Sequence, residues 1–450
     1  MQYSIVQKSQ LEGALRLDAE YYQPEYLELN SKLKSQKSKS ISELVSDIRY
    51  GLYVEPEYLE KGVNFIRALN LLNFWIDGEI LKIDERKVPP AYRLKAGDVL
   101  IVRSGANTGC VGLVYPRFEG ATFGSYTIRL RFNKINPFFA AIFLNTKYGL
   151  LQTQRLQTGM AQPNLNIPNI KEIKIPLFSE RIQNEIEKIC LEIEKEREKS
   201  ENFYSQAENL LLEELGLKDF KIEDELSYIV NLSKIKSAHR ADAEYFQPKY
   251  DKIEKILSKF KQQRLEDVSS LISYGTVPTS PYVEDGVPYV KGENLRNCFI
   301  DYSKLVYLDR ESTRKLPKKF YLKEGDIIIS QMGTVGQAGL VTKDEDGWLF
   351  ASFTIRVRLK DEVKSILDPL FVTLYIQNIS RPYYLLRRIA QASVRQNTDL
   401  PTIKDLRIPI LPKPTQQKIA NLVQKSHEAR KKAKQLLEEA KRKVEELIKK

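Results

Sequence analysis

An internal repeat covers nearly the whole length of this 450-residue chain. Residues 16–26 recur as residues 240–250, and eight of the eleven positions are identical. The same order of matching segments then continues with small insertions: 94–101 with 322–329, 125–131 with 352–358, and 167–176 with 400–409. The repeat predicts two copies of one unit, each of about 200 residues and long enough to enclose its own hydrophobic core.

Each copy alternates short β-branched segments with apolar helical segments. Residues 126–132 place Tyr126 and every second residue after it on an apolar face, with Arg129 and Arg131 on the other face, which is typical of a half-buried strand. The pairs Asn136-Pro137 and Asp368-Pro369 each precede an apolar run, as a polar N-cap and a proline do at a helix start. We therefore expect an α/β (α+β) domain in each copy, with a largely antiparallel or mixed sheet.

Each copy ends in a long amphipathic segment, after Ser179 and after Thr415, with the apolar spacing of a coiled-coil helix. Residues 180–214 hold 5 Lys/Arg and 11 Asp/Glu, whereas residues 413–450 hold 12 Lys/Arg and 5 Asp/Glu. These opposite charges favour pairing of the two helices with each other; the alternative is two unrelated helices on separate domains. The predicted organisation is a first domain, a spacer helix, a linker with the second domain, and a second spacer helix: residues 1–178, 179–216, 217–412 and 413–450.

Composition limits the chemistry of the chain. A formal charge of +12 points to a polyanionic partner, with nucleic acid the first candidate. The 3 cysteines lie far apart, and the 2 histidines have no ligand or catalytic partners at a suitable spacing, so neither a metal site nor acid–base catalysis is indicated. The longest apolar run, residues 138–144, is too short to span a bilayer, and the first residues do not form a signal peptide. We expect a soluble, cytoplasmic protein.

Two motifs invite a catalytic interpretation that their residues do not support. The segment Asn136-Pro-Phe-Phe139 lacks the second proline of the amino-methyltransferase motif, so helix capping explains it better. The glycine series at residues 105–112 and 333–339 matches neither a Walker loop nor a dinucleotide loop, and a strand-like run follows the first series. A glycine-rich hairpin loop is the better prediction, and its small side chains would allow a close approach to DNA.

The chain resembles the specificity subunits of type I restriction–modification enzymes. Three features, each present twice and in the same order, carry the resemblance: Arg-x-Asp-Ala-Glu-Tyr-(Tyr/Phe)-Gln-Pro, Lys-x-Gly-Asp before the glycine-rich loop, and Ile-Pro before the long helix. The resemblance implies two target-recognition domains separated by two long antiparallel helices, and a double-stranded DNA target with one half-site for each domain. It also implies docking of two modification (methyltransferase) subunits and of restriction (endonuclease/translocase) subunits, which supply the catalysis. The chain itself would then be no enzyme and need neither cofactor nor metal.

The residues that read DNA are expected where the copies differ in polar, loop-like segments, because shared positions belong to the scaffold. Arginine is suited to guanine, and asparagine or glutamine to adenine. The candidates in the first copy are Arg67, Asn70, Arg103, Asn107, Gln152, Gln154, Arg155 and Gln162; those in the second copy are Lys291, Asn294, Gln331, Arg387, Arg388, Gln391, Arg395 and Gln396. Asn70 and Asn294 occupy equivalent positions, so a structural role is an equal alternative for them.

Two alternatives from other classes stand beside this interpretation. The first is an enzyme, a tandem divergent DNA methyltransferase or nuclease half, which a bound methyl donor or activity of the purified chain would favour. The second is a coiled-coil scaffold that recruits partners without sequence readout, which DNA binding insensitive to sequence in the full complex would favour.

Overall fold

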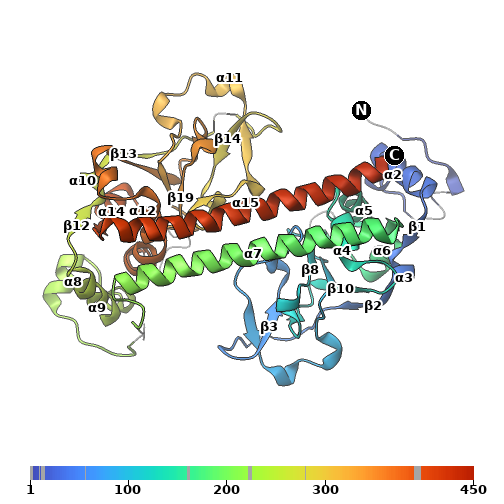
Figure 1. The fold of residues 1–450 in the computed structure, drawn as a ribbon, viewed down its shortest axis with the longest axis horizontal. Helices are drawn as coiled ribbons and strands as arrows, with labels where there is room; N and C mark the ends of the chain where they lie inside the picture. The colour runs from blue at the N-terminus through green and yellow to red at the C-terminus, as the bar shows by residue number, and fades with distance from the viewer. Residues whose placement is uncertain are drawn as a thin grey trace. The chain divides into compact units, whose positions relative to one another are not determined.

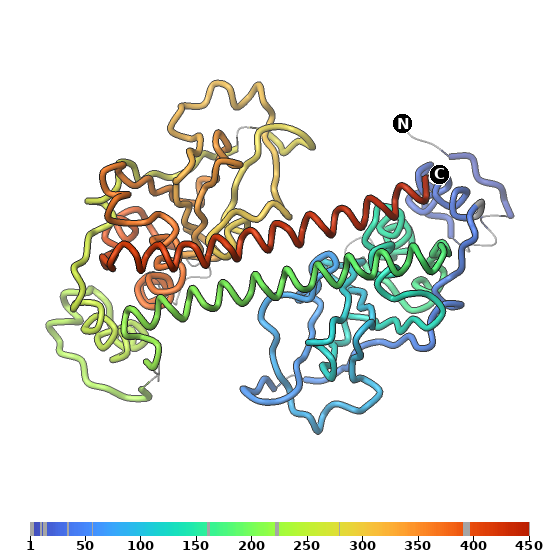
Figure 2. The backbone as a smooth tube through the Cα atoms, in the orientation of Figure 1, coloured from blue at the N-terminus to red at the C-terminus, as the bar shows by residue number. Residues whose placement is uncertain are grey.

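The chain folds into two compact units in a computed structural model. Unit 1 comprises Met1–Arg197 and Lys431–Lys450, and unit 2 comprises Glu198–Arg430. The structure describes residues 4–9, 11, 16–55, 57–159, 163–220, 225–278, 280–389 and 397–449. Each unit contains one copy of the sequence repeat, and Figures 1 and 2 follow it by colour, blue to cyan for the first copy and yellow to orange for the second.

Unit 1 is built on an antiparallel four-stranded sheet. Its strand order is β2-β10-β7-β8, with β2 Val45–Tyr50, β10 Thr127–Phe132, β7 Val99–Val102 and β8 Val111–Leu113. A smaller sheet is mixed, because β3 pairs antiparallel with β6 and parallel with β9. The other short strands are β3 Val63–Ile66, β6 Leu81–Ile83, β9 Thr122–Phe123, the hairpin β4 Leu71–Leu72 and β5 Trp75–Ile76, and the pair β1 Ser38–Ser40 and β11 Lys174–Pro176.

Unit 2 repeats this arrangement strand for strand. Its four-stranded sheet has the order β13-β21-β18-β19, with β13 Ser269–Tyr274, β21 Thr354–Leu359, β18 Ile327–Ser330 and β19 Ala338–Leu340. The smaller elements are β14 Val287–Val290, β17 Val306–Leu308, β20 Leu349–Phe350, the hairpin β15 Leu295–Arg296 and β16 Phe299–Ile300, and the pair β12 Gln262–Arg264 and β22 Arg407–Pro409. The predicted α/β class with a mixed sheet is confirmed in both copies.

The predicted helix starts are confirmed at both Asx-Pro pairs. The side chain of Asn136 accepts backbone hydrogen bonds at the start of α4 (Pro137–Leu144), and Asp368 does the same for α12 (Pro369–Tyr375). Further helices of unit 1 include η1 Ala19–Tyr22, α2 Pro24–Ser35, α3 Ile41–Leu44, α5 Lys147–Leu156 and α6 Ile167–Glu172. Those of unit 2 include α8 Leu232–Ala238, η6 Ala243–Phe246, α9 Pro248–Leu257, α10 Leu265–Val268, α11 Arg310–Thr313, the π-type η12 Ile376–Leu385, α13 Leu386–Arg388 and α14 Leu400–Lys404.

Two long helices follow the domains, α7 (Glu180–Glu214) and α15 (Lys413–Lys449). Helix α15 begins two residues before the predicted cap at Thr415. The first half of α7 and the second half of α15 belong to unit 1, whereas the second half of α7 and the first half of α15 belong to unit 2. None of the helices among the described residues is both long and apolar enough to cross a membrane.

The two long helices run antiparallel within each unit, where they lie side by side (Figure 1). In unit 1, Lys443 pairs with Glu185 at 2.8 Å, and Lys432 pairs with Glu192 and Glu196, both at 3.1 Å. In unit 2 the Ser426 hydroxyl donates to the Ser200 carbonyl at 2.8 Å. The predicted pairing of the acidic helix with the basic helix is therefore confirmed.

Each domain packs against both long helices. The small or aliphatic residues Ala440, Val444 and Ile448 of α15 lie in the core of unit 1. In unit 2 the equivalent core residues are Ala207 and Leu211 of α7 and Leu215 directly after it. Each domain also bonds to the helix that follows it directly, because Gln183 accepts from the Asn136 backbone at 2.8 Å and Gln416 accepts from the Asp368 backbone at 2.9 Å. The repeat therefore extends from the domains to their contacts with the helices.

Candidate nucleic-acid interface

The aspartate of the shared Lys-x-Gly-Asp motif is buried and forms an ion pair directly before β7 in unit 1 and directly before β18 in unit 2. In unit 1 the carboxylate of Asp98 accepts from the Lys95 backbone at 2.8 Å and from two guanidinium nitrogens of Arg131, each at 2.7 Å. In unit 2 Asp326 accepts in the same way from Arg358, at 2.6 and 2.7 Å. The hydrogen bonds that both arginines donate to these carboxylates raise their pKa above the ordinary value. These shared residues join neighbouring strands of each sheet, which is the structural role expected for positions that the two copies have in common.

A second shared arginine is buried, contrary to the predicted strand pattern. Arg129 was expected on the solvent face, but it is fully buried, because β10 is a central strand and residues 91–93 cover that face. Its guanidinium donates to the carbonyls of Ala91 and Arg93, at 3.0 and 3.2 Å, and pairs with Asp47. The equivalent Arg356 donates to the Tyr321 carbonyl at 3.2 Å, and burial lowers its pKa. Both side chains tie a loop to the sheet.

Near the beginning of each copy, a tyrosine ring lies between two arginine side chains, one close by in the sequence and one from a later helix. In unit 1 the ring of Tyr21 lies 4.5 Å from the guanidinium carbon of Arg16 and 4.1 Å from that of Arg155. Arg155 also donates to the Tyr21 carbonyl at 3.0 Å. In unit 2 the ring of Tyr245 lies between Arg240 and Arg387 in the same way, at 4.5 and 4.7 Å. These contacts favour a structural role for Arg155 and Arg387 over the predicted DNA contact.

Replacing Arg155 with alanine should therefore affect stability and leave the DNA sequence preference unchanged. The change removes a hydrogen bond and a cation–π contact, so the free energy of unfolding should fall by about 1–3 kcal/mol. Chemical denaturation measures this loss, and limited proteolysis should show earlier cleavage around residues 16–24. The neighbouring Gln154→Ala, at an exposed position of α5, is the matched control. An altered target motif with unchanged stability would instead return Arg155 to the DNA-reading surface.

Three of the predicted amides are occupied by backbone hydrogen bonds. Asn70 is buried, and its side chain bonds to the backbones of Arg67, Asp77 and Glu79 at 2.9 to 3.1 Å. The equivalent Asn294 is buried and bonds to the backbones of Lys291 and Asp301. Gln152 is also buried, and both ends of its amide bond to the backbone of Lys174, at 2.8 and 3.0 Å. These contacts and the burial of the three side chains favour structural roles for them over the predicted base contacts.

A groove lies beside the glycine-rich loop of unit 1. It has a volume of about 790 Å³, and its walls are residues 52–55 and Tyr58, the end of β3 with the residues after it, the loop 104–107 and the turn 124–126. The predicted residues Arg67 and Asn107 line it. Arg103 begins the same loop, with its guanidinium 4.7 Å from the centre of the Tyr50 ring. Two of the predicted DNA-contacting residues thus line the groove, and a third lies at the start of its loop.

The equivalent surface of unit 2 has the same framework with different side chains. Lys291 takes the place of Arg67, and each lies 5.7 Å from the centre of a tyrosine ring, that of Tyr282 and that of Tyr58 respectively. Gln331 takes the place of Arg103. The backbone N–H of Arg103 donates to the Tyr126 carbonyl at 2.9 Å, and that of Gln331 donates to the Phe353 carbonyl over the same distance. Lys291 also pairs with Glu293 at 2.6 Å. Equivalent positions of the two domains thus present different hydrogen-bonding groups.

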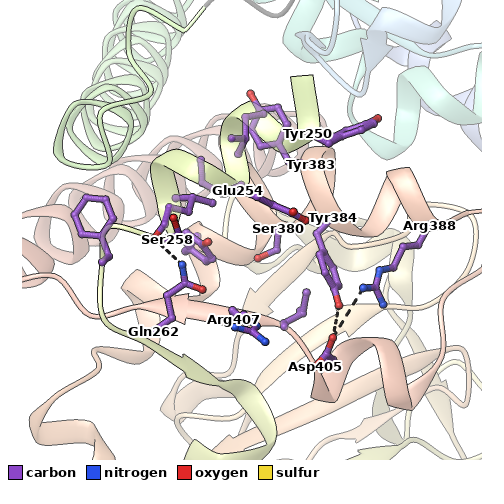
Figure 3. Close-up of a pocket in the computed structure, with 16 residues that line it drawn as sticks. Tyr250, Glu254, Ser258, Gln262, Ser380, Tyr383, Tyr384, Arg388, Asp405 and Arg407 are labelled. Atoms are coloured by element: carbon purple, nitrogen blue, oxygen red, sulfur yellow. Dashed lines mark hydrogen bonds and ion pairs between the residues drawn. The ribbon is translucent and has the colours of Figure 1, made fainter. Parts of the chain in front are cut away.

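The remaining predicted residues lie elsewhere. Arg388 lines a separate cavity of about 610 Å³ in unit 2, where its guanidinium lies 4.0 Å from the Tyr384 ring and 3.9 Å from Asp405 (Figure 3). The Tyr384 hydroxyl donates to the same carboxylate at 2.7 Å. This cavity shares no lining residue with the unit 1 groove or with its unit 2 equivalents. Four further predictions fall outside the described residues: Gln162, Gln391, Arg395 and Gln396.

The sequence analysis missed the aromatic rings at the edge of the groove. Tyr126 was placed on the apolar face of a strand, but β10 begins at Thr127, and Tyr126 stands in the preceding turn with 61% of its surface exposed. Tyr53 lines the same groove and is also exposed. The signal that was available is the match between Tyr126 and Phe353 in the aligned repeat, because an aromatic residue occupies the same position twice.

The comparisons with known proteins agree with this architecture. The model of the type I restriction modification DNA specificity domain matches residues 47–202 and 257–442, which is more than half of the chain. The chain belongs to this family. It is thus a specificity subunit of a type I restriction–modification system, the non-catalytic, DNA-recognising component of that system.

Two solved structures of this kind are similar to the chain. The S subunit of the type I restriction-modification system from M. genitalium has 14% sequence identity and a TM-score of 0.47, with 92% of this chain and 95% of that chain covered. The HsdS subunit from Thermoanaerobacter tengcongensis has 13% identity and a TM-score of 0.30, with 92% and 95% covered. None of the curated proteins compared with this chain matches it.

Proposed function

We propose that each domain reads one half of a bipartite DNA target through the surface beside its glycine-rich loop, which in unit 1 is the groove described above. The observation that carries the proposal is the change of side chains on an unchanged scaffold. Arg67 and Arg103 in the first domain are replaced by Lys291 and Gln331 in the second. Arginine and lysine bond to guanine, whereas glutamine bonds to adenine, so the two domains would recognise different half-sites.

The charge of the chain supports a polyanionic ligand for the domains. The two long helices nearly cancel each other, with 17 basic and 16 acidic residues in 180–214 and 413–450 together. Nearly all of the net charge of +12 therefore belongs to the domains and linkers. Phosphate contacts by such residues release counterions, so DNA binding should weaken steeply as salt rises.

The proposal includes two modification subunits, which dock on the chain and supply the methyl transfer, and restriction subunits, which supply translocation and cleavage. The repeated packing of α7 and α15 supports two equivalent docking surfaces, because each unit presents one half of each helix beside the same domain fold. Two identical partner subunits would then meet equivalent surfaces.

Single alanine substitutions in the unit 1 groove and on the equivalent surface of unit 2 test the readout. In the complex with the modification subunits, Arg67→Ala should relax recognition in one half of the methylated motif, and Lys291→Ala in the other half. Each loss should cost about 1–3 kcal/mol of discrimination at the position that it affects. The measurements are mapping of methylated motifs in genomic DNA and binding titrations on duplexes with single base changes.

Lys32→Ala, which removes an exposed positive charge of α2 outside the groove, is the control and should leave both halves unchanged. If Arg67→Ala and Lys291→Ala relaxed the same half-site, or left both intact, the grooves would not be the reading surfaces.

A further inference from the structure

An exposed aromatic ring stands beside the glycine-rich loop in both domains. Tyr126 in unit 1 and Phe353 in unit 2 occupy equivalent positions, and 61% and 57% of their surfaces are exposed. Most large aromatic side chains of the adjoining sheets are buried, among them Phe123 and Phe350 at the ends of the strands that lead into these turns. Exposing a large ring to water is unfavourable, and finding one at the same place in two otherwise different surfaces points to a contact with a ligand.

The turn that carries each ring is rigid. Thr127 directly after the ring is buried, and its hydroxyl donates to the Gly124 carbonyl at 2.7 Å. In unit 2, Thr354 donates to the Ala351 carbonyl over the same distance. The carbonyl of the ring-bearing residue also accepts from the first residue of the glycine-rich loop at 2.9 Å in both units. The backbone therefore holds the ring at a fixed place, and little conformational freedom is lost when it makes a contact.

The chemistry common to the two positions is that of the ring alone. Tyr126 has a hydroxyl group, but Phe353 has none, so a hydrogen bond to a base edge is not what the two share. A flat apolar face remains as the common property. Such a face stacks on any base, and an apolar side chain inserted at a base step partly unstacks it.

We propose that Tyr126 and Phe353 are stacking wedges, each of which inserts its ring against a base step in the half-site that its domain reads. The proposal rests on the groove assignment above and adds a contact that does not depend on hydrogen bonding. Neighbouring polar residues would identify the bases, while the ring would deform the duplex at a step that unstacks easily. Pyrimidine–purine steps are the expected partners, because they are the most readily unstacked.

The test uses the full chain in complex with the modification subunits, on a duplex that carries the methylated motif mapped from genomic DNA. Tyr126→Ala should weaken binding by on the order of 10-fold or more, whereas Tyr126→Phe should retain it. Phe353→Ala and Phe353→Tyr form the same pair in the second domain. The adenine analogue 2-aminopurine, placed in turn at each adenine of the motif, should brighten next to the wedge with the native ring and stay dim with alanine.

A control variant and the pattern of losses separate the possible failures. Ile229→Ala, which truncates an exposed apolar side chain in the segment before α8, away from the groove and from both long helices, should leave binding and fluorescence unchanged. If Arg67→Ala impairs recognition but Tyr126→Ala does not, the wedge is wrong and the groove assignment stands; if neither does, the groove assignment fails as well. Sensitivity to replacement of thymine by uracil, without any change in fluorescence, would identify a methyl contact and overturn the stacking proposal.

Discussion

Exchanging residues 38–176 for the equivalent segment of another specificity subunit should replace one half of the recognised motif and leave the other half intact. The segment contains the whole sheet of unit 1 and both partners of the β1–β11 pair, so no strand pairing is cut. The second domain and both long helices stay unchanged in the hybrid, and its half-site and the gap length should therefore persist. Each mismatched base pair costs about 1–3 kcal/mol, which is enough to produce a new methylation motif.

The contacts between the exchanged domain and α7 decide whether such a hybrid folds. Gln183 bonds to the Asn136 backbone, the carbonyl of Cys190 accepts from Tyr115 at 3.0 Å, and Glu194 pairs with Arg117 at 2.7 Å. A donor domain that keeps these three partners is the matched choice, and one that lacks Tyr115 and Arg117 is the control for poor docking. If a well-folded hybrid changed both halves of the motif together, the domains would not read DNA independently.

Asp326→Ala should destabilise unit 2 more than any surface substitution. The carboxylate is buried and serves two arginines: it binds Arg358 at 2.6 and 2.7 Å and lies 3.9 Å from the fully buried Arg356. Its removal leaves a buried guanidinium without a counter-charge, which costs about 3–5 kcal/mol. Hydrogen exchange of the β18 and β21 amides measures the loss locally, and chemical denaturation measures it for the whole chain.

The equivalent Asp98→Ala in unit 1 should cost less, because the buried Arg129 there pairs with Asp47 instead. Asp361→Ala, which removes an exposed carboxylate of unit 2, should have little effect and serves as the surface control. Equal losses for Asp326→Ala and Asp361→Ala would show that the buried arginine finds its compensation elsewhere.

The repeat predicted the fold well because the same pattern of strands and helices can be read independently in each of its two copies. The helix starts at Asn136 and Asp368 and the pairing of oppositely charged helices depend on local patterns, and the structure confirms them. Strand faces were less predictable. Alternation indicates one exposed face, but β10 is covered on both sides, so Arg129 is buried in spite of its charge.

The candidate site was predicted only in part, because a polar residue in a sequence does not show whether its hydrogen bonds are already made. Gln152 and Arg155 were predicted to contact DNA because of their residue types, yet their side chains already donate hydrogen bonds to the backbone carbonyls of Lys174 and Tyr21. Arg67 and Asn107 were chosen for the same reason and lie in the groove. Tyr126 was missed because a ring in an alternating run is usually a core residue, and only the position of the first strand residue removes it from the core.

The composition of the two units has a consequence for the order of folding during synthesis. Unit 2 is a continuous stretch of chain, Glu198–Arg430, and has all of its parts once the ribosome has passed them. The core of unit 1 also needs Ala433, Leu437 and Val444, which are made more than 200 residues after its sheet. Until these residues emerge, the nascent first domain exposes the apolar surface that α15 later covers, and chaperones are expected to bind there. The first domain to be synthesised is therefore expected to be the last to be completed.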